Sequence, residues 1–163
     1  YRYADELLKD LKKAPASHGI RILWLHTMPN WQEPVRQLFN CNENCQVVSC
    51  DMNFESLVNM DPEHPYESMA HRLVYSRWNS GEKRVETALE AARSLHVDGV
   101  VFFCHWGCKQ TMGLSAIFKR ELDAAGFPTL ILNGDGCDRR NASDGQTATR
   151  LNAFLEMLEK RNG

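Results

Sequence analysis

Apolar residues recur along this chain with two periods, one typical of strands and one typical of helices. Short, mainly apolar runs predict strands at residues 19–27, 45–51, 97–103 and 128–135. Helical spacing predicts helices at residues 5–13, 31–40, 66–78, 80–96, 110–126 and 144–160. Pro34 falls in the first turn of one helix, Gly126 ends another, and the prolines within residues 54–65 predict an irregular connection.

Strands that alternate with helices are typical of a parallel sheet covered on both faces. The strand interiors at 21–25, 100–103 and 129–132 are almost continuously apolar, as such a sheet requires. We therefore predict an α/β fold: a flavodoxin-like or Rossmann-like three-layer domain with a mainly parallel four-stranded sheet. Functional residues of such domains gather at the carboxyl ends of the strands, near the topological switch point.

Composition limits the classes of partner. The 163 residues suffice for one domain with a core, and 43% hydrophobic and 25% charged residues are ordinary for a globular protein. A formal net charge of −2 gives no reason to expect nucleic acid or an anionic membrane. No apolar run approaches the roughly 20 residues of a membrane span, and no signal peptide is evident, so we expect a cytoplasmic protein. The sequence begins without methionine, which favours part of a longer or processed chain.

Polar residues follow all four predicted strands, at positions 26–30, 50–51, 104–108 and 133–141. Because parallel strands end at the same edge of a sheet, we expect Cys104, Cys108 and Cys137 to lie near one another. Neither the dinucleotide-binding glycine motif nor the phosphate-binding loop is present. The chemistry of this edge therefore depends on its cysteines.

The six cysteines allow several interpretations. Cys41, Cys45 and Cys50 are either small buried residues or part of metal or redox chemistry. A zinc site needs four ligands in a tetrahedral array, and Cys104, Cys108 and a neighbouring histidine are weak evidence for one. A nucleophilic cysteine with an adjacent histidine base is disfavoured, because neighbouring side chains point apart. An iron–sulfur ligand, a thiolate on a loop beside an apolar wall, fits better.

Three segments carry a family resemblance: "MDPEHPYESMAHRLV", "CHWGCKQTMG" and "ELDAAGFPTLILNGDGCDRRNASDGQTATRLNAFLEML". They resemble the C-terminal domain of the 2-hydroxyacyl-CoA dehydratase family, which includes the benzoyl-CoA reductase subunits. The resemblance implies that residues 1–163 are a single domain of a longer two-domain subunit. It also implies a [4Fe-4S] or double-cubane cluster between the domains, with two cysteine ligands from the N-terminal domain and one from this chain.

The resemblance further implies a lyase activity, the radical elimination of water from a 2-hydroxyacyl-CoA. The implied partners are the N-terminal domain, a second homologous subunit, the acyl-CoA substrate, and an ATP-dependent activator that supplies the electron. The isolated chain is then expected to be inactive. Two alternatives stay open: a double-cubane type of low-potential reductase, and a non-catalytic scaffold or regulatory domain of the same fold.

Candidate site residues follow from the same resemblance. The family ligand lies about twenty residues before the proline of the Gly-Phe-Pro turn, which favours Cys108 as the metal ligand over Cys104. Cys104 and Cys137 are either extra ligands or neighbours of the cluster.

Five further residues are candidates to orient the substrate or the cluster sulfurs. The candidate catalytic residues are His105, Ser143 and Gln146, and the candidate cofactor-binding residues are Asn141 and Trp106. Ser143 has a simpler alternative, because a serine at that position can cap the last helix.

Overall fold

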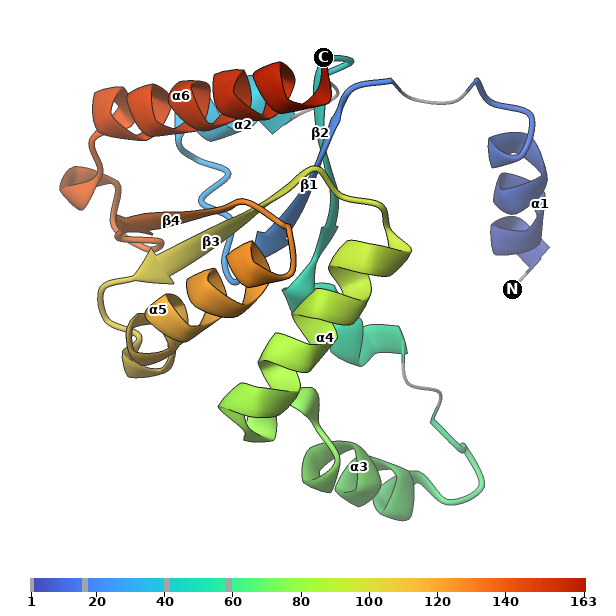
Figure 1. Ribbon diagram of the computed structural model, residues 1–163. Coiled ribbons are helices and arrows are strands. Elements are labelled where there is room, and N and C mark those ends of the chain that lie inside the picture. The colour runs from blue at the N-terminus through green and yellow to red at the C-terminus, as the bar shows by residue number, and fades with distance from the viewer. Residues whose placement is uncertain (1, 16–17, 40–41, 58–59) are drawn as a thin grey trace.

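The structure, a computed structural model, describes residues 2–15, 18–39, 42–57 and 60–163 (Figure 1). Cys41 lies outside these residues, so its interpretation stays a prediction. The described elements, where η marks a 3-10 helix, are α1 (Arg2–Leu11), β1 (Ile20–Leu25), α2 (Glu33–Phe39), β2 (Cys45–Cys50), η1 (Asp51–Leu57), α3 (Pro65–Val74), η2 (Arg77–Asn79), α4 (Gly81–Ser94), β3 (Gly99–His105), α5 (Lys109–Ala124), β4 (Thr129–Gly134), η3 (Arg139–Asn141) and α6 (Asp144–Asn162).

The four strands form one parallel sheet in the order β2-β1-β3-β4, which confirms the predicted fold class. The central strands are β1 and β3, in which Trp24 pairs with Val101, and the edge strands are β2 and β4. The chain runs from β1 out to β2 and then crosses to β3 on the other side. The topological switch point therefore lies between the carboxyl ends of β1 and β3.

Helices cover both faces of this sheet (Figure 1). On one face, Trp24 and Phe103 of the sheet pack in a core with Leu151 of α6. On the other face, Phe102 lies 4.8 Å, between ring centroids, from Phe118 of α5, in a core that α4 completes. Successive strand residues thus contribute to opposite cores, as the near-continuous apolar strands predict.

The C-terminus of α5 confirms the predicted role of Gly126. This residue has a φ of 91°, in the left-handed region that favours glycine. Its N–H donates to the carbonyl of Asp123 at 3.0 Å, and the next N–H, from Phe127, donates to Leu122 at 2.9 Å. These bonds satisfy the last carbonyls of the helix and turn the chain into β4.

Several element boundaries differ from the prediction. The predicted helix 66–78 ends as α3 at Val74, because the Asn79 side chain donates to the carbonyls of Leu73 and Val74 at 2.7 and 3.0 Å. Strand β3 does not stop at residue 103 but continues to His105, since its pairing with β4 extends that far. The predicted irregular connection begins within the 3-10 helix η1.

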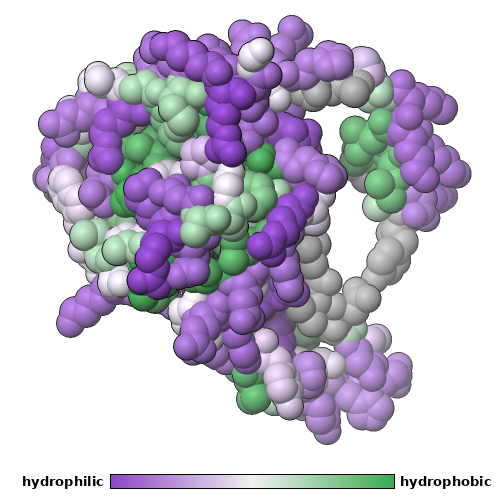
Figure 2. Space-filling model, viewed as in Figure 1, coloured by the Kyte–Doolittle hydropathy of each residue, from purple (hydrophilic) through white to green (hydrophobic). Residues whose placement is uncertain are grey.

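Helices α1 and α3 contain no buried residue. Figure 1 draws α1 apart from the sheet and its covering helices, and Figure 2 shows hydrophobic residues on the side of α1 that faces them across open space. Among the helices of the described segments, none has the length and apolar character that a membrane crossing needs.

Candidate functional site

The turn between β3 and α5 places Cys108 at the start of a helix. Cys108 is the N-cap of α5, and its N–H donates to the carbonyl of His105 at 2.9 Å. Its side chain is partly exposed. Thr111, through its side chain first and then its backbone, lowers the pKa of the Cys108 thiol. The helix N-terminus also favours a negative charge, so the local structure favours the thiolate, the form that binds metals.

Cys104 has the opposite environment, although only four positions separate the two residues. It is fully buried in β3, in the core that contains Phe102 and Phe118. Its Sγ lies 3.8 Å from the carbonyl oxygen of Thr111, to which it donates. Burial raises the pKa of the Cys104 thiol to about 11. Cys104 therefore behaves as a neutral core residue in this structure.

His105 is held by the turn that follows β4. The Gly136 N–H donates to His105 Nδ1 at 3.0 Å. Because a backbone N–H can only donate, Nδ1 must accept, and the proton of the neutral ring lies on Nε2. Gly107 passes directly over the ring, since a Cβ at this position would lie 3.0 Å from Nε2. The two glycines thus fix the orientation of the imidazole and the position of its proton.

Asp135 organises the turn after β4. Its Oδ1 accepts the N–H groups of Cys137 and Asp138 at 2.9 and 3.0 Å, and its Oδ2 accepts from the Asn141 side chain at 2.9 Å. These bonds, with that from Asn141 the largest, hold the pKa of Asp135 at about 2. The structure therefore shows Asn141, a candidate cofactor-binding residue, engaged with Asp135.

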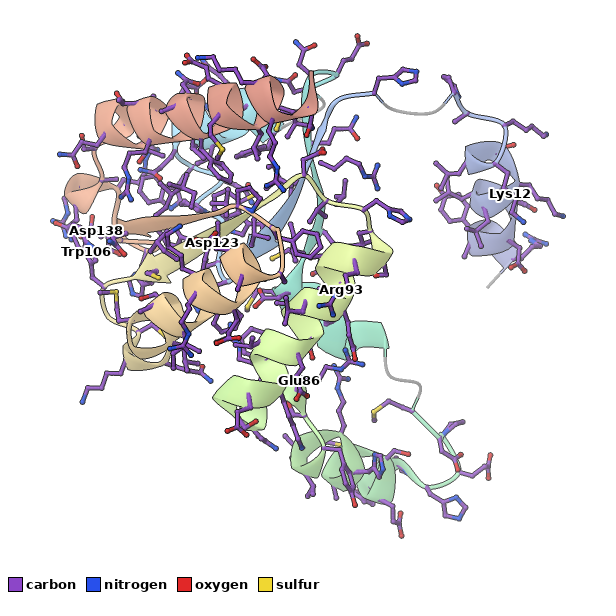
Figure 3. The ribbon with its side chains drawn as sticks, in the orientation of Figure 1. Lys12, Glu86, Arg93, Trp106, Asp123 and Asp138 are labelled. Atoms are coloured by element: carbon purple, nitrogen blue, oxygen red, sulfur yellow. The ribbon has the colours of Figure 1, made fainter. Side chains whose placement is uncertain are left out.

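Two candidates, His105 and Cys137, lie close to Asp135, for which no role was predicted. One ligand atom from each lies within 4.8 Å of the others, which is close enough to hold a metal ion. Within the described residues, the sulfurs of Cys104, Cys108 and Cys137 do not form such a group. Figure 3 labels Trp106 and Asp138 at this same end of the molecule, beside the carboxyl ends of β3 and β4.

The remaining candidates lie on the exposed rim. Trp106 is 55% exposed, and its N–H donates to the carbonyl of Gly134 at 3.0 Å. Ser143 caps α6, where its hydroxyl accepts the Gln146 N–H at 3.4 Å. This contact is the helix cap that the simpler alternative for Ser143 predicts. The catalytic roles of Ser143 and Gln146 stay predictions.

A buried polar group at the ends of β1 and β2 received no role from the sequence. Asp51 Oδ1 accepts the His26 N–H at 2.5 Å, and Asp51 Oδ2 accepts from Arg84 Nη2 at 3.0 Å. Burial lowers the pKa of His26, whose φ of 70° lies in the left-handed region. One signal in the sequence could have indicated that Arg84 is buried. Arg84 precedes Ala88 and Ala92 by four and eight positions, and helical spacing places all three on the face that the structure buries.

All of these residues lie within the range that matches a known protein family. A family model described as 2-hydroxyglutaryl-CoA dehydratase, D-component, matches residues 1–158. No curated protein matches the chain at the similarity required of a relative. The matched range contains the carboxyl ends of all four strands and the first turns of α5 and α6.

Proposed function

Because the chain belongs to the 2-hydroxyglutaryl-CoA dehydratase D-component family, we propose that it forms one wall of the iron–sulfur site of a 2-hydroxyacyl-CoA dehydratase. In this proposal residues 1–163 are the C-terminal domain of a two-domain subunit. The N-terminal domain supplies two further cysteine ligands, and a second homologous subunit and an ATP-dependent activator complete the system. A cytoplasmic location belongs to the proposal, because low-potential thiolate chemistry needs a reducing compartment.

The observation that carries the proposal is the contrast between Cys108 and Cys104. Cys108 is partly exposed at the N-terminus of α5, and Thr111 lowers the pKa of its thiol. Cys104 is fully buried, with a pKa of about 11. A cluster ligand must be a thiolate that reaches beyond its own domain, so Cys108 fits that role and Cys104 does not.

When bound, an iron–sulfur cluster supplies low-potential electron transfer and, at an iron without a protein thiolate, a Lewis acid for a substrate oxygen. The chain's own residues then bind and orient. Cys108 is the ligand, and His105 presents Nε2–H as a fixed donor because Gly136 occupies Nδ1. Asn141 acts indirectly, through Asp135 and the turn that holds His105.

Measuring iron and sulfide in cysteine variants of the anaerobically purified full-length subunit tests this proposal. We expect Cys108→Ala to lose the cluster absorbance and all activator-dependent turnover, because a methyl group cannot replace an iron–thiolate bond. Cys104→Ala should keep its iron. Cys50→Ala is the matched control, since Cys50 is the last residue of β2 and burial raises its pKa to about 11, as it does for Cys104. Full iron in Cys108→Ala with loss in Cys104→Ala would contradict the assignment.

A second candidate function, a double-cubane reductase, draws support from Cys137. Its sulfur lies with His105 and Asp135 in a group that could hold metal, so this chain has a donor beyond Cys108. A Cys137→Ala variant separates the two functions. Unchanged iron per subunit favours the single-cluster dehydratase, whereas loss of about half of the iron favours the reductase.

A further inference from the structure

A hollow between α3 and α4 lies outside the proposed cluster site. Its volume is about 570 Å³, which is within the range of small-molecule sites. Residues from β2, η1, α3, η2 and α4 line it, whereas the β3–α5 and β4–η3 turns contribute none. Figure 1 shows α3 below α4 and away from α6. The hollow is therefore distinct from the site that contains Cys108.

The hollow has apolar lining residues and an exposed aromatic pair. Phe54, Ala91 and Leu95 are partly buried and pack against the core on the α4 side of the sheet. The rings of His71 and Tyr75 lie 4.4 Å apart between centroids, and Tyr75 is 64% exposed. Exposed aromatic rings beside apolar residues provide a surface on which a flat ring can stack.

The charged residues of the hollow carry an excess of positive charge. Among the described residues that line it, Glu90 is the one carboxylate, against two arginines. Arg77 Nη1 lies 3.8 Å from Glu90 Oε2 and 3.5 Å from the Thr87 hydroxyl, to which it donates. The Arg72 side chain is partly buried and has no hydrogen-bond or ion-pair partner within the described segments. The charge of Arg72 is therefore available to an anion.

A buried cation adjoins the hollow. A cavity of about 10 Å³, with room for one water molecule at most, shares Phe54, Arg77 and Thr87 with it. Arg84 also lines this cavity, and its side chain is 3% exposed. Its Nη2 donates to Asp51, but its Nη1 has no hydrogen-bond partner among the described residues. Because a buried charged N–H costs free energy unless something accepts its proton, this side of the hollow also favours an acceptor.

We propose that the hollow binds a purine nucleoside monophosphate, with the base on the aromatic pair and the phosphate on Arg72. A guanidinium donates two parallel hydrogen bonds to a phosphate, and bases stack on exposed aromatic side chains. Because a side chain holds the phosphate, the site needs neither of the glycine motifs that the sequence lacks. Helix α3 contains no buried residue, and the ligand would give it a contact with α4. The inference does not rest on the proposed function, since no candidate cluster residue lines the hollow.

Isothermal titration calorimetry of the full-length protein with adenosine monophosphate (AMP) tests this site. Adenosine supplies the ring without the charge, and inorganic phosphate supplies the charge without the ring. Arg72→Met removes the cation, Arg72→Lys keeps the charge without the planar fork, and Tyr75→Ala removes the stacking surface. Arg93→Met is the matched control, because Arg93, labelled on α4 in Figure 3, is exposed and does not line the hollow.

We expect AMP to bind saturably and more tightly than adenosine or phosphate alone. Arg72→Met should weaken AMP binding about tenfold or more, and Arg72→Lys should weaken it less. Adenosine binding should be unchanged in Arg72→Met, whereas Tyr75→Ala should weaken the binding of both ligands. Arg93→Met should not differ from the unaltered protein. Because α3 has no buried residue, the urea midpoint should be the same in all of these variants.

Three results would overturn the inference. The absence of saturable heat with AMP at millimolar concentration would exclude a nucleoside monophosphate. Equal losses in Arg72→Met and Arg93→Met would show a general effect of charge. AMP binding that survives both Arg72→Met and Tyr75→Ala would place the ligand elsewhere in the protein. None of these results bears on the proposed function, which the iron measurements test separately.

Discussion

Asp135 shows how one carboxylate can set the shape of the site. It joins three groups of its own turn, and the same turn holds His105 through the Gly136 N–H. The pKa of Asp135 is held at about 2, below its ordinary value of 3.8, chiefly by the bond from Asn141. Because the pKa of this carboxyl is lower in the folded than in the unfolded protein, ionised Asp135 stabilises the fold at pH values above the unfolded pKa. This stabilisation is lost as the pH falls toward 2.

Asn141→Ala should therefore raise the pKa of Asp135 toward 3.8 and reduce the acid resistance of the turn. The pKa is measured by a carbon-13 NMR titration of the Asp135 carboxyl, and the stability by unfolding between pH 2 and pH 5. Asn152→Ala is the control, since Asn152 is exposed and lies within α6, outside this turn. An unchanged Asp135 pKa in Asn141→Ala would show that the backbone N–H groups suffice.

The positions of some candidate residues were easier to predict from the sequence than those of others, for physical reasons. Cys108 was predictable, because a cysteine at the exit of a buried strand must lie at the sheet edge, where the structure has it. The partner of Asn141 was not, because the hydrogen bonds within a turn depend on its conformation. Arg84 was missed because a charged residue on a helix is usually exposed, and only the packing of Trp78 and Phe118 buries it.

At the scale of elements, the sheet and its helices followed from periodicity, whereas the short 3-10 helices did not. The strands and long helices each bury a continuous apolar face, which leaves a repeating pattern in the sequence. A 3-10 helix such as η2 has three residues and depends on single contacts, among them the Ser76 hydroxyl that accepts the Trp78 N–H. Such contacts have no period, so the end of α3 was misplaced.

Contact between α6 and β3 gives a prediction at this scale. A Cβ added to the buried Gly99 would lie 2.7 Å from Leu158 and 2.9 Å from Phe154, both on α6. Gly99→Ala should therefore push α6 from the sheet and cost about 1–3 kcal/mol of unfolding free energy. Gly113→Ala is the control, because nothing lies within 4 Å of its added Cβ on the exposed side of α5. That change should stabilise the protein by about 0.5–1 kcal/mol.

Urea unfolding measures both variants, with the midpoint compared at equal slope. Equal stability of Gly99→Ala and the unaltered protein would mean that α6 repacks without cost. A loss of stability in Gly113→Ala would point to a contact on α5 that the described structure does not contain.

At the scale of the whole molecule, the chain divides into a packed sheet domain and less buried helices. β1 and β3 are almost wholly buried, and two hydrophobic cores flank them. By contrast, Leu7, Leu8 and Leu11 of α1 are 46%, 54% and 58% exposed. An isolated helix of this length is only marginally stable in water, so α1 adds little to the cooperativity of the domain.

The residues 1–163 alone should accordingly fold in one cooperative transition of the sheet and its covering helices, yet bind little iron. The two cores provide the burial that folding requires, whereas the proposed cluster takes two of its three cysteine ligands from another domain. The measurements are urea unfolding and iron per chain after anaerobic purification, with the full-length subunit as the comparison. One four-iron cluster per isolated chain would contradict the shared-ligand arrangement. Iron retained at that level in Cys108→Ala would also remove Cys108 from the site.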